Sequence, residues 1–469
     1  MLNYFPKYFT SKAISLYLGV LVLCNIIFFS HVLGLIWWVF GLVEVVSFFY
    51  FSNQLTRQWA DYTEKKFTKN LFQSALILRL VWVIFSYFFY IYLNGKPFEF
   101  DTSDAFGYHN EALRIVTMIQ NGNILSYMDS MKGYYSDMGY PFYLGWQYLI
   151  TGGSILIARI IKATLSATTC VLIYKLATRN FGEETGRMAA IFCMLMPNLI
   201  YYTGLHLKET EMLFLTVAFV ERADSMFRNK KFNVAEIAPP VLLAASLFLF
   251  RTVLGAVAFL AMFTTLVFTS TKILGIGKRI MLSVWMLAVV GYFVGGTIST
   301  ELESVWATRG TNQETSMKMR ATEKNGNKFA KYATGAIFAP IIFVIPFPTL
   351  VETPMQQNQK LINGGNFVKN IMAFFTLFAL FWIIKNKKWR DYLLIGSFTI
   401  GYLMVISFSA FGQSERFHLP ALPFELILAA FGISLITNKE KKYFRWWMMF
   451  LFVAIVAWSW IKLAGRGMA

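Results

Sequence analysis

The chain has 469 residues, of which 57% are hydrophobic, 18% aromatic and only 14% charged. Soluble globular domains are about a quarter charged, so the composition excludes an ordinary soluble domain and favours a membrane protein. The formal net charge of +18 would suit nucleic acid, but the Lys and Arg residues cluster in short segments between apolar runs. This clustering is typical of the positive-inside rule. We therefore expect membrane lipids around the chain and no nucleic-acid partner.

Apolar runs of about 17–25 residues, each long enough to cross a hydrocarbon core as a helix, recur along the whole chain. They are continuous and lack the alternation of outer-membrane barrels. The sequence therefore predicts an all-α, polytopic integral membrane protein with about 13 transmembrane helices and with amphipathic or re-entrant helices on the outer face. The expected spans are 13–30, 33–51, 71–93, 155–178, 188–204, 212–220 extended on both sides, 239–250, 252–269, 280–297, 367–384, 392–410, 421–437 and 446–463.

Basic residues fill alternate links between these spans, beginning with Arg57, Lys65 and Lys66. If the N-terminus is cytoplasmic, all these links fall on the cytoplasmic side. We then expect a bacterial inner (cytoplasmic) membrane protein whose functional site faces the periplasm or exterior. The chain divides into four parts: residues 1–70, two extra N-terminal spans and a basic link; 71–298, a transmembrane core with a first outer loop at 94–153; 299–366, a second outer loop; and 367–469, the C-terminal spans.

The middle of the second outer loop is apolar but is interrupted by Pro340, Pro346 and Pro348. Proline removes a backbone donor and breaks a helix interior, so this stretch is too broken for a simple span. It predicts a re-entrant or interfacial element.

The first outer loop contains an acidic pair, Asp101 and Asp104, just beyond an apolar span. One carboxylate would take a proton from an acceptor hydroxyl while the other orients the acceptor or a metal. The alternative is that one of them only caps the amphipathic helix expected over 105–120. Asp104 falls at the start of that helix, where the dipole favours an ionised carboxylate, so Asp101 is the first candidate for a general base.

Further candidates in this loop are His109, Glu111 and Tyr140, which we assign to acceptor binding. His109 would also suit a phosphate or a metal, although a lone histidine near aromatic residues is more often structural. The sequence is compatible with a divalent cation as a cofactor but does not identify its ligands. It indicates no other cofactor.

Two later segments add charge near the same side of the membrane. Lys208 would pair with a phosphate and Glu209 would complete an acidic cluster, because charged residues at membrane depth usually face a polar cavity. An ordinary surface pair between Lys208 and a neighbouring glutamate is the alternative. Arg416 offers a planar fork that suits phosphate oxygens, and His418 adds a donor two residues later. Arg251 is another phosphate candidate, although it would also suit snorkelling to the interface.

Several short patterns occur in a fixed order across residues 71–436. They are the Asp101/Asp104 pair, 139–145, 158–161, 172–177, 181–182, Pro197-Asn198, Lys208-Glu209 and 415–420. In this order and sidedness they resemble the GT-C superfamily of membrane glycosyltransferases. The resemblance is strongest to the branch that includes protein O-mannosyltransferases and bacterial aminoarabinose transferases. The two extra N-terminal spans depart from that family's pattern.

The resemblance implies an enzyme, a glycosyltransferase that moves a sugar from a polyprenyl-phosphate donor to a lipid, glycan or protein acceptor on the outer leaflet, usually with inversion. By position it makes Asp101 the catalytic base and Arg416 a ligand of the donor phosphate. The chain contains no phosphate-cradling Gly-rich loop, which fits a lipid-linked donor better than a nucleotide sugar.

Two other function classes remain as alternatives. An O-antigen-type polymerase or ligase would use lipid-pyrophosphate glycans, but the early acidic pair weighs against it. A lipid or solute transporter or flippase would need ionisable residues in the middle of spans, and Glu44 is the clearest of few.

Overall fold

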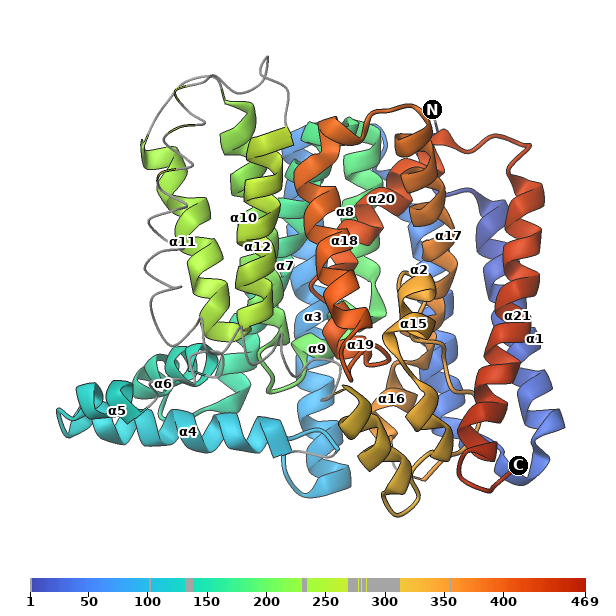
Figure 1. The fold of residues 1–469 in the computed structure, drawn as a ribbon, viewed down its shortest axis with the longest axis horizontal. Helices are drawn as coiled ribbons and strands as arrows, with labels where there is room; N and C mark the ends of the chain where they lie inside the picture. Colours follow the sequence, from blue (N-terminus) through green and yellow to red (C-terminus); the bar gives the residue numbers. More distant parts are fainter. Residues whose placement is uncertain are drawn as a thin grey trace.

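The computed structural model describes residues 2–100, 103–130, 138–229, 234–268, 313–354 and 356–469, with the single positions 277, 280 and 284. In these residues the regular secondary structure is helical and no strand is present. The longer helices lie side by side in one bundle, and shorter helices gather at one end of it (Figure 1). The expected all-α class is confirmed for this part of the chain.

Within the described ranges, six helices are long and apolar enough to cross a membrane: α1 (Lys7–Ile27), α2 (Leu35–Gln58), α3 (Glu64–Asn94), α7 (Ile155–Phe181), α17 (Asn363–Lys385) and α21 (Lys441–Ala464). Shorter helices accompany them: α8 (Glu183–Leu195), α10 (Glu209–Arg228), α11 (Val234–Phe250), α12 (Thr252–Phe268), α18 (Leu393–Ser407) and α20 (Leu422–Leu435). These helices support an integral membrane protein. The larger number of about 13 spans stays a prediction, and the expected span 280–297 lies outside the described residues apart from two positions.

Two of the spans expected near prolines differ in the structure. The span expected over 188–204 is broken, because α8 ends at Leu195 and α9 (Pro197–Thr203) begins two residues later. Met196 between them is extended, as expected for a residue that precedes a proline. The short span expected from Pro239 is longer in the structure, since α11 begins at Val234 and continues through both prolines.

The two ends of the bundle carry different elements. The links that follow α2, α7, α17 and α20 lie at the end where the N-terminus is marked (Figure 1), and these are the basic links of the sequence. At the opposite end α4 (Ser103–Gln120), with α5 (Ile124–Ser130) and α6 (Gly139–Thr151), lies across the ends of the long helices. Helix α4 buries Ala105, Ala112 and Ile115 on one face, as predicted for an amphipathic surface helix.

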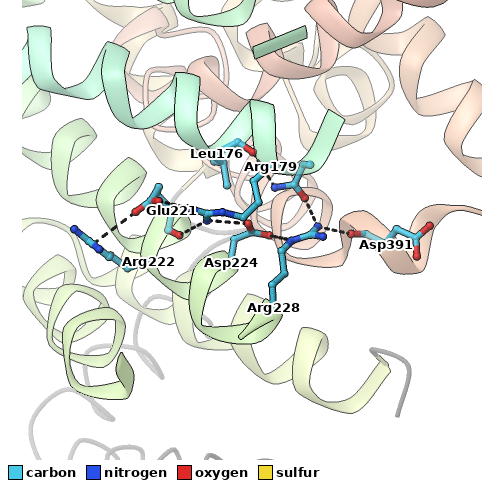
Figure 2. Close-up of polar contacts among 8 residues, drawn as sticks. Leu176, Arg179, Glu221, Arg222, Asp224, Arg228 and Asp391 are labelled. Carbon is cyan, nitrogen blue, oxygen red and sulfur yellow. Dashed lines mark hydrogen bonds and ion pairs between the residues drawn. The ribbon is translucent and has the colours of Figure 1, made fainter. Parts of the chain in front are cut away.

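An ion-pair network ties α7 to α10 at the basic end (Figure 2). Arg179 of α7 pairs with Glu221 at 2.6 Å and with Asp224 at 3.1 Å. Arg228 pairs with the other oxygen of Asp224 at 3.0 Å and donates to the carbonyl of Asp391 at 3.3 Å. Both arginines are therefore held by acidic or carbonyl oxygens of the protein itself.

Residues 345–350, within the Pro-interrupted stretch, have no regular secondary structure and are buried. Non-helical backbone at membrane depth is tolerated only where the protein satisfies its polar groups, and side chains of α17 do so here. Asn363 accepts from the N–H of Thr349 at 2.9 Å and donates to its carbonyl at 2.7 Å. Asn370 donates to the carbonyl of Pro346 at 3.0 Å. This burial agrees with a re-entrant element, whose relation to the membrane stays a prediction.

The sidedness can be tested with single cysteines at Ser126 on α5 and at Asn386 after α17, two exposed positions. If the basic links face the cytoplasm, a membrane-impermeant maleimide should label Ser126→Cys only in right-side-out cells and Asn386→Cys only in inverted vesicles. The native Cys24, Cys170 and Cys193 are buried and provide a low-background control. Labelling of both positions from one side would contradict the arrangement.

Candidate functional site

Four charged side chains from separate segments meet at the end of the bundle opposite the basic links. Arg416, in the short helix α19 (Glu415–His418), donates from Nη1 to Oδ2 of Asp104 at 2.5 Å. Its Nε donates to Oε1 of Glu209, the first residue of α10. Nη2 of Arg251, between α11 and α12, lies 3.7 Å from the same glutamate oxygen. We call these four residues the arginine–carboxylate cluster, and all four are site residues that the sequence predicted.

Burial increases across the arginine–carboxylate cluster. The side chain of Asp104 is 53% exposed, that of Arg416 is 20% exposed and that of Glu209 is fully buried. Burial by itself lowers the pKa of Arg416, but the neighbouring Glu209 carboxylate and the hydrogen bonds to Asp104 and Glu209 outweigh it and raise that pKa. Arg416 is thus a permanent cation with one buried partner and one partner that solvent can reach.

Arg251 points into the protein. Its guanidinium carbon lies 4.2 Å from the ring centroid of Phe417, and Nη1 donates to the hydroxyl of Tyr402 at 3.2 Å. That hydroxyl in turn donates to the carbonyl of Phe417 at 3.1 Å. Because the side chain is only 14% exposed, the structure favours an inward role over snorkelling.

A second group of buried charges lies beside the first. Nζ of Lys162, on α7, is 3.5 Å from Glu211 and donates to the Tyr140 hydroxyl at 3.3 Å and to the Leu205 carbonyl at 2.8 Å. The first turn of α10 therefore contributes a carboxylate to each group of charges, since Glu209 contacts Arg416 and Glu211 contacts Lys162.

Several polar atoms of this second group have no hydrogen-bond partner among the described residues. They are Nε and Nη1 of Arg159, Oε2 of Glu99, Nδ1 of His206 and both carboxylate oxygens of Glu211, whose contact with Lys162 is an ion pair at 3.5 Å. Arg159 is fully buried and uses only Nη2, which donates to the carbonyl of Pro97 at 2.5 Å. Burial raises the pKa of Glu99, and Arg159 opposes this effect. Unpartnered buried polar groups are rare in folded proteins, so this group is chemically suited to hydrogen-bond a polar ligand.

His109 of α4 is connected by hydrogen bonds to Tyr148 of α6 and through it to His206, in the link between α9 and α10. Nδ1 of His109 lies 2.8 Å from the hydroxyl of Tyr148, which lies 3.0 Å from Nε2 of His206. Burial lowers the pKa of both histidines, so both are neutral and the hydroxyl donates to one ring and accepts from the other. His109 thus has a structural partner, which is the alternative that the sequence left open.

Three other residues that the sequence predicted for the site are not members of the arginine–carboxylate cluster. Lys208 is buried and its ammonium lies 5.8 Å from the ring centroid of Tyr108 on α4. Glu111 pairs with Arg114 at 3.4 Å on the exposed side of α4, as a surface pair would. Asp101 lies outside the described residues.

The structure does not bring His418 to the arginine–carboxylate cluster. Its Nδ1 accepts from the Lys369 ammonium at 2.8 Å, so Nε2 carries the proton and donates to the Gly412 carbonyl at 2.9 Å. Both ring nitrogens of this buried histidine are occupied by protein atoms. The expected contribution of His418 to phosphate binding has no support in this geometry.

Glu44, on which the transporter alternative depends, also has a structural partner. Its Oε2 accepts from the N–H of Gly365 at 3.0 Å, in the first turn of α17. A carboxylate at this position satisfies a free backbone donor and compensates the helix dipole. The role of Glu44 in the structure is therefore that of a cap on α17.

Sequence reasoning missed Arg159 and Lys162 as site residues. They lie three positions apart in the apolar run of α7 and so share one face of that helix. Two cations on one face of a membrane span are a signal of an internal polar site, and this signal was available without the structure. Glu99 had no comparable signal, because it sits in an irregular link.

No group of three His, Cys, Asp or Glu side chains that could hold a metal ion is present within the described residues. Comparison with known proteins gives no matching protein family, no matching curated protein and no matching solved structure. What this end of the bundle can do therefore follows from the chemistry of the two charged groups.

The burial gradient predicts unequal effects on stability. Arg416→Met leaves the buried Glu209 carboxylate with only the more distant Arg251, and we expect destabilisation approaching about 3–5 kcal/mol. Asp104→Asn removes a half-exposed pair and should cost less than about 1 kcal/mol. Thermal unfolding of the purified protein in detergent measures the difference, with Glu314→Gln, which breaks an exposed pair with Lys318, as control. An equal loss of unfolding free energy in the Arg416 and Asp104 variants would contradict the expectation that the more buried pair contributes more to stability.

Proposed function

We propose that this protein is a membrane glycosyltransferase that moves a sugar from a polyprenyl-phosphate donor to a lipid, glycan or protein acceptor at the outer face of the membrane. The observation that carries the proposal is the arginine–carboxylate cluster, where Arg416 and Arg251 meet Asp104 and Glu209. It lies at the end of the bundle away from the basic links, which is the periplasmic or exterior side if those links are cytoplasmic.

The two arginines suit the leaving group. In the reaction the acceptor oxygen forms a bond to the anomeric carbon of the sugar while the bond from that carbon to the phosphate oxygen breaks. The electron pair leaves with the lipid phosphate, whose growing negative charge Arg416 and Arg251 stabilise. The hydroxyl proton passes to a carboxylate, which the resemblance assigns to Asp101.

Asp104 would act as the exchangeable partner of Arg416. In the structure it lies in the first turn of α4 and accepts a hydrogen bond from the guanidinium. An entering phosphate would replace this half-exposed carboxylate, whereas the buried Glu209 would keep Arg416 in place. The displaced Asp104 is then free to orient the acceptor.

The second charged group would bind the sugar. Sugar hydroxyls both donate and accept hydrogen bonds, and this group offers the unpartnered nitrogens of Arg159 beside the unpartnered oxygen of Glu99. Lys162 and Glu211 add a further donor and acceptor close by. A polyhydroxylated ligand suits such a mixture better than a simple anion does.

Transfer by the purified protein from polyprenyl-phosphate sugars tests this function. Asp101→Asn keeps the shape of the side chain but removes its proton acceptance, so turnover should fall by at least about 10²-fold while donor binding is kept. Glu314→Gln, the same chemical change at an exposed pair, should leave the rate unaltered. Normal turnover in Asp101→Asn would remove it as the base. Transfer only from lipid-pyrophosphate glycans would instead favour a polymerase or ligase.

Arg416 gives a separate test through donor affinity. Arg416→Ala should weaken binding of the donor by about 1.5–3 kcal/mol, the scale of a hydrogen bond to a charged group. Arg416→Lys should restore part of it, because a point charge replaces a planar fork. Donor affinity that is unchanged in Arg416→Ala would take this residue out of the phosphate site.

A further inference from the structure

Side chains of α1 and α21 line a groove that no part of the proposed function uses. These are the helices nearest the two chain ends (Figure 1). The groove has a volume of about 310 Å³, at the lower end of the range for small-ligand sites. Apolar side chains form most of its wall, among them Leu16 of α1 and Met448, Phe452 and Val453 of α21. It opens on the outer surface of the bundle, where Val453 is 64% exposed.

Two cations, Lys12 and Arg445, also line this groove. Both helices run inward from the basic end, so the apolar residues lie three to eight positions further along, roughly 4–12 Å deeper at 1.5 Å per residue. The groove is therefore charged at the expected membrane surface and apolar below it. This is the polarity of a phospholipid, with its phosphate at the surface and its acyl chain inside the bilayer.

Neither cation is neutralised by a carboxylate of the described chain. No ion pair involves Lys12 or Arg445 among the described residues, and Nε of Arg445 donates to the hydroxyl of Tyr8 at 3.4 Å. Arg179 and Arg228, at the same end of the bundle, are instead held by Glu221 and Asp224 (Figure 2). Unneutralised Lys and Arg side chains beside membrane helices attract anionic lipid head groups.

We propose that the groove between α1 and α21 binds one anionic glycerophospholipid. Lys12 and Arg445 hold its phosphate, and one acyl chain lies against Leu16, Met448 and Phe452. A zwitterionic lipid carries its own cation and fits less well, because two uncompensated positive charges face the head group. The site lies at the end of the bundle opposite Arg416, so it is separate from the donor site and independent of the proposed function.

Lipid titration of the delipidated full-length protein tests the site. We expect dioleoylphosphatidylglycerol to bind more tightly than dioleoylphosphatidylcholine, with binding followed by native mass spectrometry and by the rise in unfolding temperature. The double variant Lys12→Gln/Arg445→Gln should bind phosphatidylglycerol about 30-fold more weakly, the sum expected for two cations near the surface. The matched control Lys65→Gln/Lys69→Gln removes two exposed cations of α3 and should keep the wild-type preference.

A third variant, Leu16→Trp, fills the apolar part of the groove without changing charge. It should weaken binding of both lipids, and it keeps the proposal testable if the double variant fails to fold. Equal affinity of the wild type for the two lipids would overturn the proposal. So would an equal loss in the Lys65/Lys69 control, which would show general surface attraction, or unchanged binding in Leu16→Trp.

Discussion

The ion pair between Arg416 and Glu209 is the interaction on which the rest of the candidate site depends. Glu209 is fully buried at the start of α10, where the helix dipole favours a negative charge. A carboxylate buried at this place needs a cation, and Arg416 supplies it from a segment more than two hundred positions away in the sequence. The pair thereby joins the α9–α10 corner to the link between α18 and α20. It also places the remaining donors of Arg416 towards α4 and the outer surface.

The surrounding elements explain why this end of the bundle can hold charge. The break at Pro197 and the irregular link to α10 place backbone carbonyls, such as that of Leu205, where Lys162 can donate to them. The amphipathic helix α4 covers the charged groups from outside and contributes Asp104. Buried charges remain stable only when such partners are present, and the side that lacks them, around Arg159 and Glu99, is where a polar ligand is best accommodated.

The sequence predicted the membrane character, the helical class and the amphipathic helix α4, because these follow from hydropathy and periodicity within short windows. It also named all four members of the arginine–carboxylate cluster from charge placed near span ends. It did not predict that they touch, since Asp104 and Arg416 are 312 positions apart and no local pattern encodes such a contact. It also did not predict that the ring of His418, two residues after Arg416 in the same short helix, turns towards Lys369.

We propose that Arg416 is the cation that binds the donor phosphate and that Asp104 is its ion-pair partner until the donor enters. The most direct measurement is the affinity of polyprenyl phosphate for the wild type and for Asp104→Asn, because the amide keeps the side-chain shape and removes the competing charge. We expect Asp104→Asn to bind polyprenyl phosphate more tightly than the wild type and Arg416→Ala to bind it more weakly. Weaker binding in Asp104→Asn would contradict this role of Asp104, because it would make Asp104 part of the phosphate site and not a competitor of the phosphate.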